Sequence, residues 1–392
     1  MSANPNLYTN PGAAKTYREQ LLPLRESILA DAVMIGEIPS PTFSEEKLVK
    51  YVCDRFTEEN LDSITIDEMQ NATAVLSGQS GKKNILVAAH VDSVWEDTVD
   101  HTVAVTTDSL IGPKIADNAL GVATLTTLPF LLRALDIKLQ SNLVLLGASR
   151  SLGRGDLGGL RFFTDHVKIP IGAAVCLEGV QLGRLSYSSL GMNRCELKVS
   201  TPEKRNWGEW GLSGSIVFMN RILQRILSIE TPEVPKTSII LGSINAGTSF
   251  NVPPKHATLR FEVRSEEPGM VTRIREQIEE FIEEIIAENH IEVSLEVLAQ
   301  RRPGSIGFSH PYVRSARAIM KELGIEPTVA PSTSELSVLL DKGIPSMTLG
   351  ITEGDNKHQF DETIKIDPIF NGLAQLISVL QSIDKQLHDE QN

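Results

Sequence analysis

The sequence predicts an α/β protein with a mainly parallel sheet flanked by helices and with an inserted α+β domain. Two runs, NILVAAH at 84–90 and NLVLLGA at 142–148, have the uniformly apolar composition of strands that are buried on both faces. A segment with helical apolar spacing at 121–135 lies between them. Strands that alternate with helices in this way build parallel sheets, because the helix carries the chain back to the starting edge of the sheet.

The elements around these strands follow from the same spacing rules. Apolar residues at helical spacing begin near the N-terminus, Pro39 and Pro41 prevent that helix from continuing, and Ser44 is placed to cap the next one. The expected elements are helices 14–37 and 44–60, strands 72–78 and 84–90, helix 121–135, strand 142–148, a helix after 310, helix 334–340 and strand 345–351.

A different pattern replaces the α/β alternation near residue 192 and ends before residue 310. Its strands alternate between apolar and polar residues, as half-exposed antiparallel strands do. Its last helix is rich in Glu, which we interpret as the solvated face of an amphipathic helix. The expected elements are strands 195–200, 237–244 and 257–265 and helices 212–228 and 270–290. The chain is therefore expected to form a discontinuous domain, 1–191 with 304–392, and an inserted lid domain, 192–303.

Composition narrows the class of protein. The 392 residues are 41% hydrophobic and 22% charged, as in soluble globular proteins. The net charge of −13 argues against nucleic-acid binding, which needs a basic face. Three distant cysteines indicate a reducing compartment, not a disulfide framework. The N-terminus has no apolar signal core and no run approaches about 18 apolar residues, so we expect a cytoplasmic protein without a membrane span.

Residue types that bind metals recur at the ends of predicted strands. His90 and Asp92 follow the first apolar strand, Asp117 precedes a helix, Glu178 ends the strand of VCLEG, and His358 lies in the loop of KHQFDE. Singly, each is more typical of a surface or capping residue than of a metal ligand. Together they favour a metal site, because α/β sheets bind ligands at their strand ends and a carboxylate such as Asp92 commonly orients a zinc-binding histidine.

At these motifs the chain resembles the zinc exopeptidase family of aminoacylase, acetylornithine deacetylase, succinyl-diaminopimelate desuccinylase, tripeptidase T and carboxypeptidase G. The resemblance covers about residues 15–385. It implies a two-zinc amide hydrolase fold with a lid domain through which the chains form a homodimer. The motifs that carry it are AHVDSV, GPKIADNALGVA, CLEG, NWGEWG, GSINAGTSFNVPPKHATLRFEVRSEE, STSELSVLLDKGIPSMTLG and KHQFDE.

Carried over by position, the resemblance implies a set of metal ligands. His90, Asp117 and Glu178 would hold one zinc ion, and Asp92 would orient His90. Asp117 would also bridge to a second ion, which would take His358 and one of two adjacent glutamates that the family places after the strand at 142–148.

That glutamate pair has no counterpart in this chain. Ser151 and Leu152 stand at its positions, and a one-residue shift would place Arg150 and Ser151 there. No Asp or Glu occurs between Asp136 and Asp156. Without the first glutamate there is no general base, a loss that typically costs on the order of 10²–10⁴-fold in rate. Without the second, the second ion loses a ligand, so we expect one zinc ion or none.

The resemblance also assigns residues that would meet the substrate. Asn251, Arg264 and the Gly247 region would contact it from the lid. Arg205 stands where the family has a histidine that stabilises an oxyanion, and it is equally typical of a solvated loop charge. Glu335 replaces a usual aspartate and keeps its charge. Outside this set, Asp156 is the acid nearest the missing pair, and we interpret it as a helix cap in preference to a substitute base.

Three functions remain open at this stage. The first is a metallopeptidase or amidohydrolase for a small amide, such as a dipeptide or N-acyl amino acid, with weak or absent hydrolysis. The second is a non-catalytic ligand-binding or regulatory homologue. The third is repurposed one-metal amide chemistry, including amide formation. All three imply a small amide or amino-acid-derived ligand, without nucleic acid or membrane as a partner.

Overall fold

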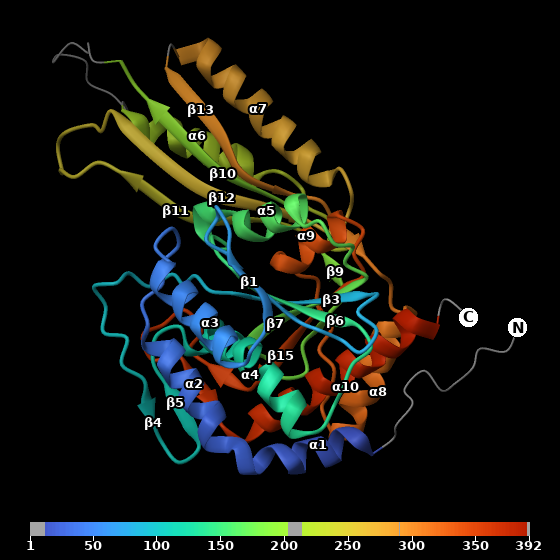
Figure 1. Ribbon diagram of the computed structural model, residues 1–392. Coiled ribbons are helices and arrows are strands. Elements are labelled where there is room, and N and C mark those ends of the chain that lie inside the picture. The colour runs from blue at the N-terminus through green and yellow to red at the C-terminus, as the bar shows by residue number, and fades with distance from the viewer. Residues whose placement is uncertain (1–11, 203–213, 290, 390–392) are drawn as a thin grey trace, which may run out of the picture. The chain divides into compact units, whose positions relative to one another are not determined.

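The computed structural model describes residues 12–202, 214–289 and 291–389. The chain forms two compact units (Figure 1). Unit 1 runs up to Ser188 and resumes at Ser305, and unit 2 spans Ser189–Gly304. The chain leaves unit 1 through β9 (Ser188–Ser189) and returns through β14 (Gly304–Ser305).

Unit 1 is built on a seven-stranded sheet with the strand order β1-β2-β6-β3-β7-β15-β8. The four central strands, β6, β3, β7 and β15, are parallel. The outer strands β1, β2 and β8 run antiparallel to their neighbours. The bounds are β1 (Asp62–Ile66), β2 (Ala72–Leu76), β3 (Asn84–His90), β6 (Asn142–Ala148), β7 (Ala173–Val180), β8 (Leu185–Ser186) and β15 (Ser346–Thr352). The predicted α/β class is confirmed, with a mixed sheet whose centre is parallel.

Alternate residues of β3 face two different hydrophobic cores, which explains its uniformly apolar sequence. Ile85 and Val87 pack in the larger core with the helices of one face. Leu86 and Ala88 pack in the smaller core with the helices of the other face. The first face carries α1 (Ala13–Leu21), α2 (Arg25–Glu37), α3 (Glu46–Glu58), α4 (Leu120–Ala134), α8 (Pro311–Leu323) and α10 (Asp367–Asp389), and the second carries α5 (Gly158–His166) and α9 (Glu335–Asp341).

Two local expectations for the helices were wrong. The expected helix at 14–37 is interrupted by a 3-10 turn at Leu22–Leu24, because Pro23 lacks the backbone N–H that an uninterrupted helix needs there. Ser44 does not cap α3; the residue before its first turn is Glu45, and no side chain caps it.

The segment Ile115–Ala134, which contains α4, is among the described residues the one helical stretch long and apolar enough to cross a membrane. In the protein, 94% of its apolar window is buried. It packs against α2 and the parallel strands, so we describe it as the central core helix of unit 1.

A small antiparallel sheet joins two loops that are distant in sequence. Its strand order is β16-β17-β5-β4, with bounds β4 (Ala104–Val105), β5 (Ser109–Ile111), β16 (Gly354–Asp355) and β17 (Thr363–Lys365). Thr363 pairs with Ile111. The loop that follows β5 and the loop that precedes β17 are thereby brought together, and these loops carry Asp117 and His358.

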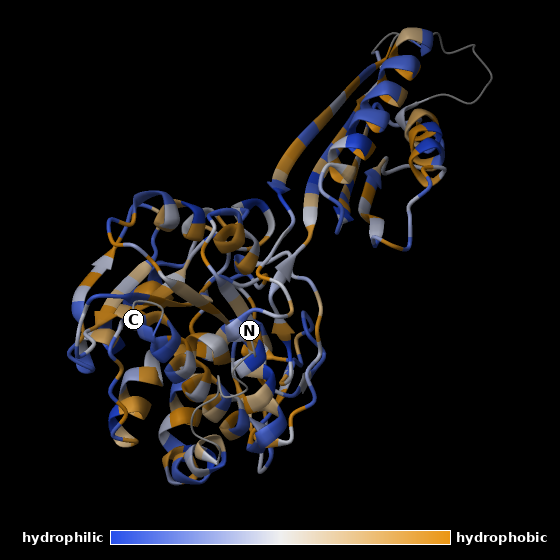
Figure 2. Ribbon diagram, turned by 90° about the vertical axis from the view of Figure 1, so that its right-hand side faces the viewer, coloured by the Kyte–Doolittle hydropathy of each residue, from blue (hydrophilic) through white to orange (hydrophobic). Residues whose placement is uncertain are grey.

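The described residues of unit 2 form a four-stranded antiparallel sheet with two helices. The strand order is β11-β12-β10-β13, and alternating hydrophobic and hydrophilic residues can be followed along its strands in Figure 2. The apolar side chains pack against the helices in a separate core. The bounds are β10 (Gly191–Ser200), α6 (Ser215–Leu227), β11 (Thr237–Ala246), β12 (His256–Ser265), α7 (Met270–Asn289) and β13 (Glu292–Arg301).

Candidate metal centre

His90 is the last residue of β3, and both of its ring nitrogens have carboxylate neighbours. Nδ1 lies 3.0 Å from the backbone oxygen of Asp92 and 3.5 Å from its Oδ1. Nε2 lies 3.2 Å from Oδ1 of Asp117. Burial alone would lower the pKa of His90, but the hydrogen bonds to Asp117 and Asp92 raise it well above its usual value. Asp92 thus lies next to Nδ1 of the His90 ring.

Asp117 lies between the two predicted histidines. Its Oδ1 faces His90, and its Oδ2 lies 2.7 Å from Nε2 of His358. Burial opposes ionisation, yet the hydrogen bonds from His358 and His90 hold the pKa of this carboxyl well below its usual range. The carboxylate therefore has the two-sided arrangement of a bridging ligand.

Glu178 lies in β7 and completes a group of three side chains that could hold a metal ion. One donor atom each from His90, Asp117 and Glu178 lies within 4.8 Å of the others, and all three residues are buried. An imidazole nitrogen with two carboxylate oxygens is a donor set that zinc accepts in catalytic sites, where water or substrate fills the open position. The residues present therefore fit one ion of this kind.

Glu362 holds the backbone of both loops of the site, and the sequence analysis did not identify it. Its Oε2 accepts the backbone N–H groups of Ala116 (3.0 Å) and Asp117 (3.2 Å), and its Oε1 accepts that of His358 (2.9 Å). Glu362 is fully buried, and burial raises its pKa. The sequence feature that could have identified Glu362 is its position four residues after His358, in the same KHQFDE motif.

Two cations of the chain also reach the carboxylates, and neither was predicted. Nζ of Lys357 lies 3.3 Å from Oδ2 of Asp117 and 3.9 Å from Oε2 of Glu178. Nη1 of Arg184 lies 3.4 Å from Oε1 of Glu178. Burial disfavours the charged ammonium, but Glu178 and Asp117 raise the pKa of Lys357 above its usual value.

The positions expected for the glutamate pair follow β6, whose last residue, Ala148, is paired with His90. Ser151 is buried, and its hydroxyl has no hydrogen-bond partner among the described residues. The backbone N–H of Leu152 donates to Oδ2 of Asp92 (2.8 Å). The backbone N–H of Arg150 donates instead to Glu45 (2.8 Å). Leu152 thus lies beside Asp92, and Ser151 directly precedes it in the chain.

The other residues singled out from the sequence have different surroundings. Glu335 begins α9 and is buried. The burial of the His90 ring itself would lower the pKa of His90, and Glu335 is among the carboxylates that raise this pKa. Asp156 does not cap α5, because Leu157 occupies the N-cap position, and its Oδ2 lies 3.7 Å from Arg161.

The predicted substrate residues of the lid lie in unit 2. Arg264 in β12 donates from Nε to Glu262 (2.8 Å). Asn251, in the loop between β11 and β12, accepts a hydrogen bond from Ser249 (3.2 Å). Arg205 and the NWGEWG motif lie outside the described residues.

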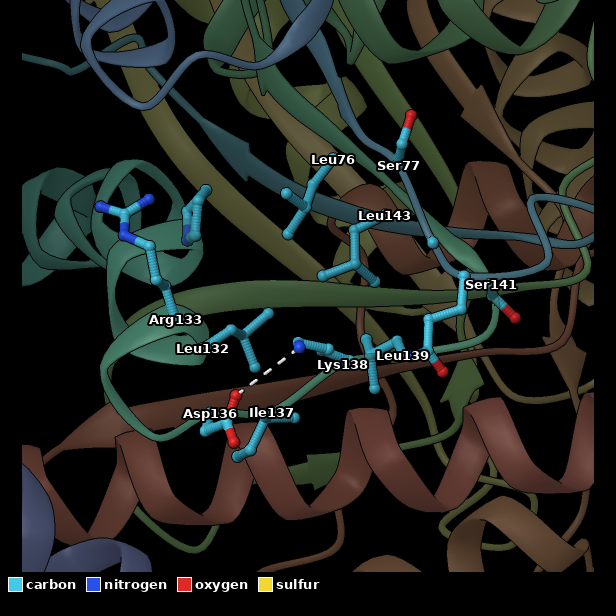
Figure 3. Close-up of a pocket in the computed structure, with 13 residues that line it drawn as sticks. Leu76, Ser77, Leu132, Arg133, Asp136, Ile137, Lys138, Leu139, Ser141 and Leu143 are labelled. Atoms are coloured by element: carbon cyan, nitrogen blue, oxygen red, sulfur yellow. Dashed lines mark ion pairs between the residues drawn. The ribbon is translucent and has the colours of Figure 1, made fainter.

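A pocket of about 330 Å³ lies elsewhere in unit 1 (Figure 3). It is lined by the end of β2, the end of α4 and the beginning of β6, including Leu76, Arg133 and Leu143. Leu143 is near the start of β6, whereas Ala148 at its other end is paired with His90. The pocket is therefore at the opposite end of the parallel strands from the metal-binding group.

Comparison with known proteins agrees with this architecture. Residues 208–290 match the M20 peptidase dimerisation domain. A [LysW]-lysine/[LysW]-ornithine hydrolase of Saccharolobus islandicus (strain Y.N.15.51 / Yellowstone #2) is 24% identical over 312 residues, which cover 77% of this chain and 82% of the relative. The enzyme of the same name from Saccharolobus solfataricus is 26% identical over 167 residues, or 41% of this chain and 46% of the relative.

Solved structures share the fold. The dipeptidase Dug1p of Saccharomyces cerevisiae superposes with a TM-score of 0.80 at 11% identity, covering 96% of this chain and 99% of that one. Aminopeptidase PepT of Bacillus cereus gives 0.71 at 15% identity, covering 92% and 98%. The YXEP protein of Bacillus subtilis, a dinuclear metal-binding peptidase of the M20 family, gives 0.64 at 15% identity, covering 94% and 98%.

The chain thus has the fold of M20 peptidase structures. The resemblance to the zinc exopeptidase family is confirmed: the chain carries the M20 peptidase dimerisation domain, has hydrolases as its sequence relatives and has the fold of M20 peptidases.

Proposed function

We propose that the protein is a one-metal member of the amide-hydrolase scaffold, with a small amide or amino-acid-derived ligand and with weak or absent hydrolysis. One observation carries this proposal: donor atoms of His90, Asp117 and Glu178 lie within 4.8 Å of one another, while the side chains at 151 and 152 supply no carboxylate. The names of the relatives describe action on [LysW]-lysine and [LysW]-ornithine, and a dipeptidase shares the fold. Both support an amide of an amino acid as ligand.

The proposed roles follow from the contacts. His90, Asp117 and Glu178 would hold one zinc ion, and Asp92 would keep the His90 ring in position through Nδ1. Such an ion, when bound, would polarise the amide carbonyl as a Lewis acid. Other residues are proposed to contact either a second ion or the ligand: His358, Asn251, Arg264, Arg205 and Glu335.

The missing step is removal of a proton. Ser151 can donate a hydrogen bond, but an ordinary hydroxyl does not accept a proton from water near neutral pH. Leu152 offers neither a base nor a ligand. We therefore expect turnover on the order of 10²–10⁴-fold below that of an enzyme with the base in place.

The presence of Ser151 and Leu152 in place of the glutamate pair also favours a second candidate. This candidate is a non-catalytic ligand-binding or regulatory homologue that retains the metal site to recognise its ligand. Repurposed one-metal amide chemistry, including amide formation, is the third. A ligand that binds without being consumed would favour the second candidate over the first.

We further propose that unit 1 is the catalytic-type domain and that unit 2 is a lid through which two chains form a homodimer in the cytoplasm. The M20 dimerisation domain match in unit 2 supports this assembly. So does β11, an edge strand with exposed apolar side chains at Ile240 and Ile244.

The test combines metal analysis with an activity panel. Purified protein is loaded with Zn²⁺, its metal content is measured by mass spectrometry, and hydrolysis of dipeptides and N-acyl amino acids is followed. We expect one ion per chain in the wild type, no ion in Glu178→Ala, and little or no turnover. Glu353→Gln, which changes an exposed carboxylate paired with Lys365, serves as the control. Robust cleavage of a dipeptide that Glu178→Ala abolishes would show an active one-metal hydrolase, and two ions per chain would refute the one-ion site.

A further inference from the structure

Lys357 and His358 are neighbours in sequence, yet both side chains reach the same carboxylate oxygen. His358 Nε2 lies 2.7 Å and Lys357 Nζ lies 3.3 Å from Oδ2 of Asp117. Neighbouring side chains of an extended chain point to opposite sides. Here Asn356 and His358 have positive φ angles of 58° and 66°, so the backbone turns on both sides of Lys357 and directs both side chains to Asp117.

This oxygen, Oδ2, is the one that faces His358. The other oxygen, Oδ1, faces His90. An ion on the other side would need Oδ2 and His358, and Leu152 removes its remaining ligand. The Lys357 ammonium already lies against Oδ2 and is also 3.9 Å from Glu178.

Two of the carboxylates in the site lie against cations of the chain itself. Asp117 and Glu178 contribute two negative charges, and Lys357 and Arg184 contribute two positive charges at 3.3–3.4 Å from them. Arg184 is held in place by hydrogen bonds from Nε to Ser186 and from Nη2 to Ser332, both 3.3 Å. An additional divalent ion at Oδ2 would meet the positive charge of Lys357 at short range, where Coulomb repulsion is strong.

We propose that the ammonium of Lys357 takes the place of a second divalent ion at Asp117. The inference rests on the proposed one-ion function and adds the reason that the site stays at one ion: it lacks a ligand at Leu152 and also contains a competing cation. Restoring a carboxylate at position 152 alone is therefore insufficient to bind a second ion.

The experiment counts bound ions in four proteins: wild type, Lys357→Met, Leu152→Glu and the double variant. Zn²⁺ is titrated by calorimetry, and ions per chain are measured by mass spectrometry after gel filtration, with Co²⁺ absorption spectra as a readout of coordination. We expect one ion in the wild type and in Leu152→Glu, one ion bound at least tenfold more tightly in Lys357→Met, and two ions in the double variant.

Two controls separate charge from side-chain removal. Lys357→Arg keeps a cation and should bind Zn²⁺ as the wild type does. Lys365→Met removes an ammonium that pairs with exposed Glu353 outside the site and should change neither count nor affinity. Circular dichroism and thermal unfolding of each variant establish that it is folded.

The outcomes distinguish this inference from the proposed function. Two ions in Leu152→Glu, one ion in the double variant, or unchanged affinity in Lys357→Met would each overturn the role of Lys357. A wild type without any ion would refute the one-ion function; binding gained in Lys357→Met would then still support the competing cation. No ion in any of the four proteins would overturn both.

Discussion

Asn118 holds the backbone on both sides of Glu178. Its Nδ2 donates to the carbonyl of Leu177 (2.9 Å), and its Oδ1 accepts the N–H of Gly179 (2.8 Å). Because Asn118 directly follows Asp117, one buried amide fixes the separation of two proposed metal ligands.

Asn118→Ala should therefore weaken both the fold and the metal site. It would leave two buried backbone groups without partners, at about 1–3 kcal/mol each, so we expect the free energy of unfolding in urea to fall by about 2–4 kcal/mol. Zn²⁺ affinity should fall at least tenfold. Asn220→Ala, on the exposed face of α6, is the control and should be nearly neutral. Unchanged stability of Asn118→Ala would show that the amide does not hold β7.

Glu362→Gln tests the carboxylate behind the two loops. Glutamine has one acceptor oxygen, whereas Glu362 uses both of its oxygens to accept three N–H groups. Losing a group that orients metal ligands typically costs 10–100-fold in metal affinity, and we expect a fall of that order in a Zn²⁺ titration. Glu353→Gln should have no effect. Full affinity in Glu362→Gln would rule out the positioning role.

Lys114 provides a pH test. It is buried, its ammonium donates to Ser40 (3.0 Å) and to the carbonyl of Ile38, and burial lowers its pKa to about 7. Below pH 7 the lysine is charged in the folded and unfolded states, and the full cost of burying the charge is present. Between pH 7 and about 10.5 only the unfolded state holds the proton, so this cost is progressively relieved as pH rises.

The measurement is the free energy of unfolding of the wild type minus that of Lys114→Met, at pH 7 and pH 10. We expect this difference to rise with pH by several kcal/mol, on the order of 4 from the size of the pKa shift. Subtracting the variant removes the contribution of other titrating groups. If this difference in the free energy of unfolding does not change with pH, burial does not lower the pKa of Lys114 in the folded state.

The proposed homodimer is tested at β11. Ile244 is 54% exposed on this edge strand, and a buried charge there would be costly to an interface. Light scattering after gel filtration should give twice the mass of one chain for the wild type and the mass of one chain for Ile244→Glu at micromolar concentration. Ile66→Glu, on the edge strand β1 of unit 1, should remain dimeric. A monomeric wild type would refute the assembly.

Much of the fold could be predicted because its determinants are local. The apolar runs at 84–90 and 142–148 are recognisable without knowing their neighbours, since burial on both faces requires every residue to be apolar. The direction of the outer strands β1, β2 and β8 could not be predicted, because it depends on which partner strand each one meets. The break at Pro23 was visible in the sequence and was not used.

The sequence by itself determined the α/β class, the resemblance to the zinc exopeptidase family, the candidate ligands at strand ends and the absence of carboxylates at positions 151 and 152. Only the tertiary structure decided what surrounds those ligands. Lys357 and Glu362 meet the Asp117 loop across about 240 residues of chain, through pairing of β5 with β17. A charged residue in a loop has no sequence signature that separates a solvated side chain from one that lies against a buried carboxylate, because the difference arises only when distant strands pair.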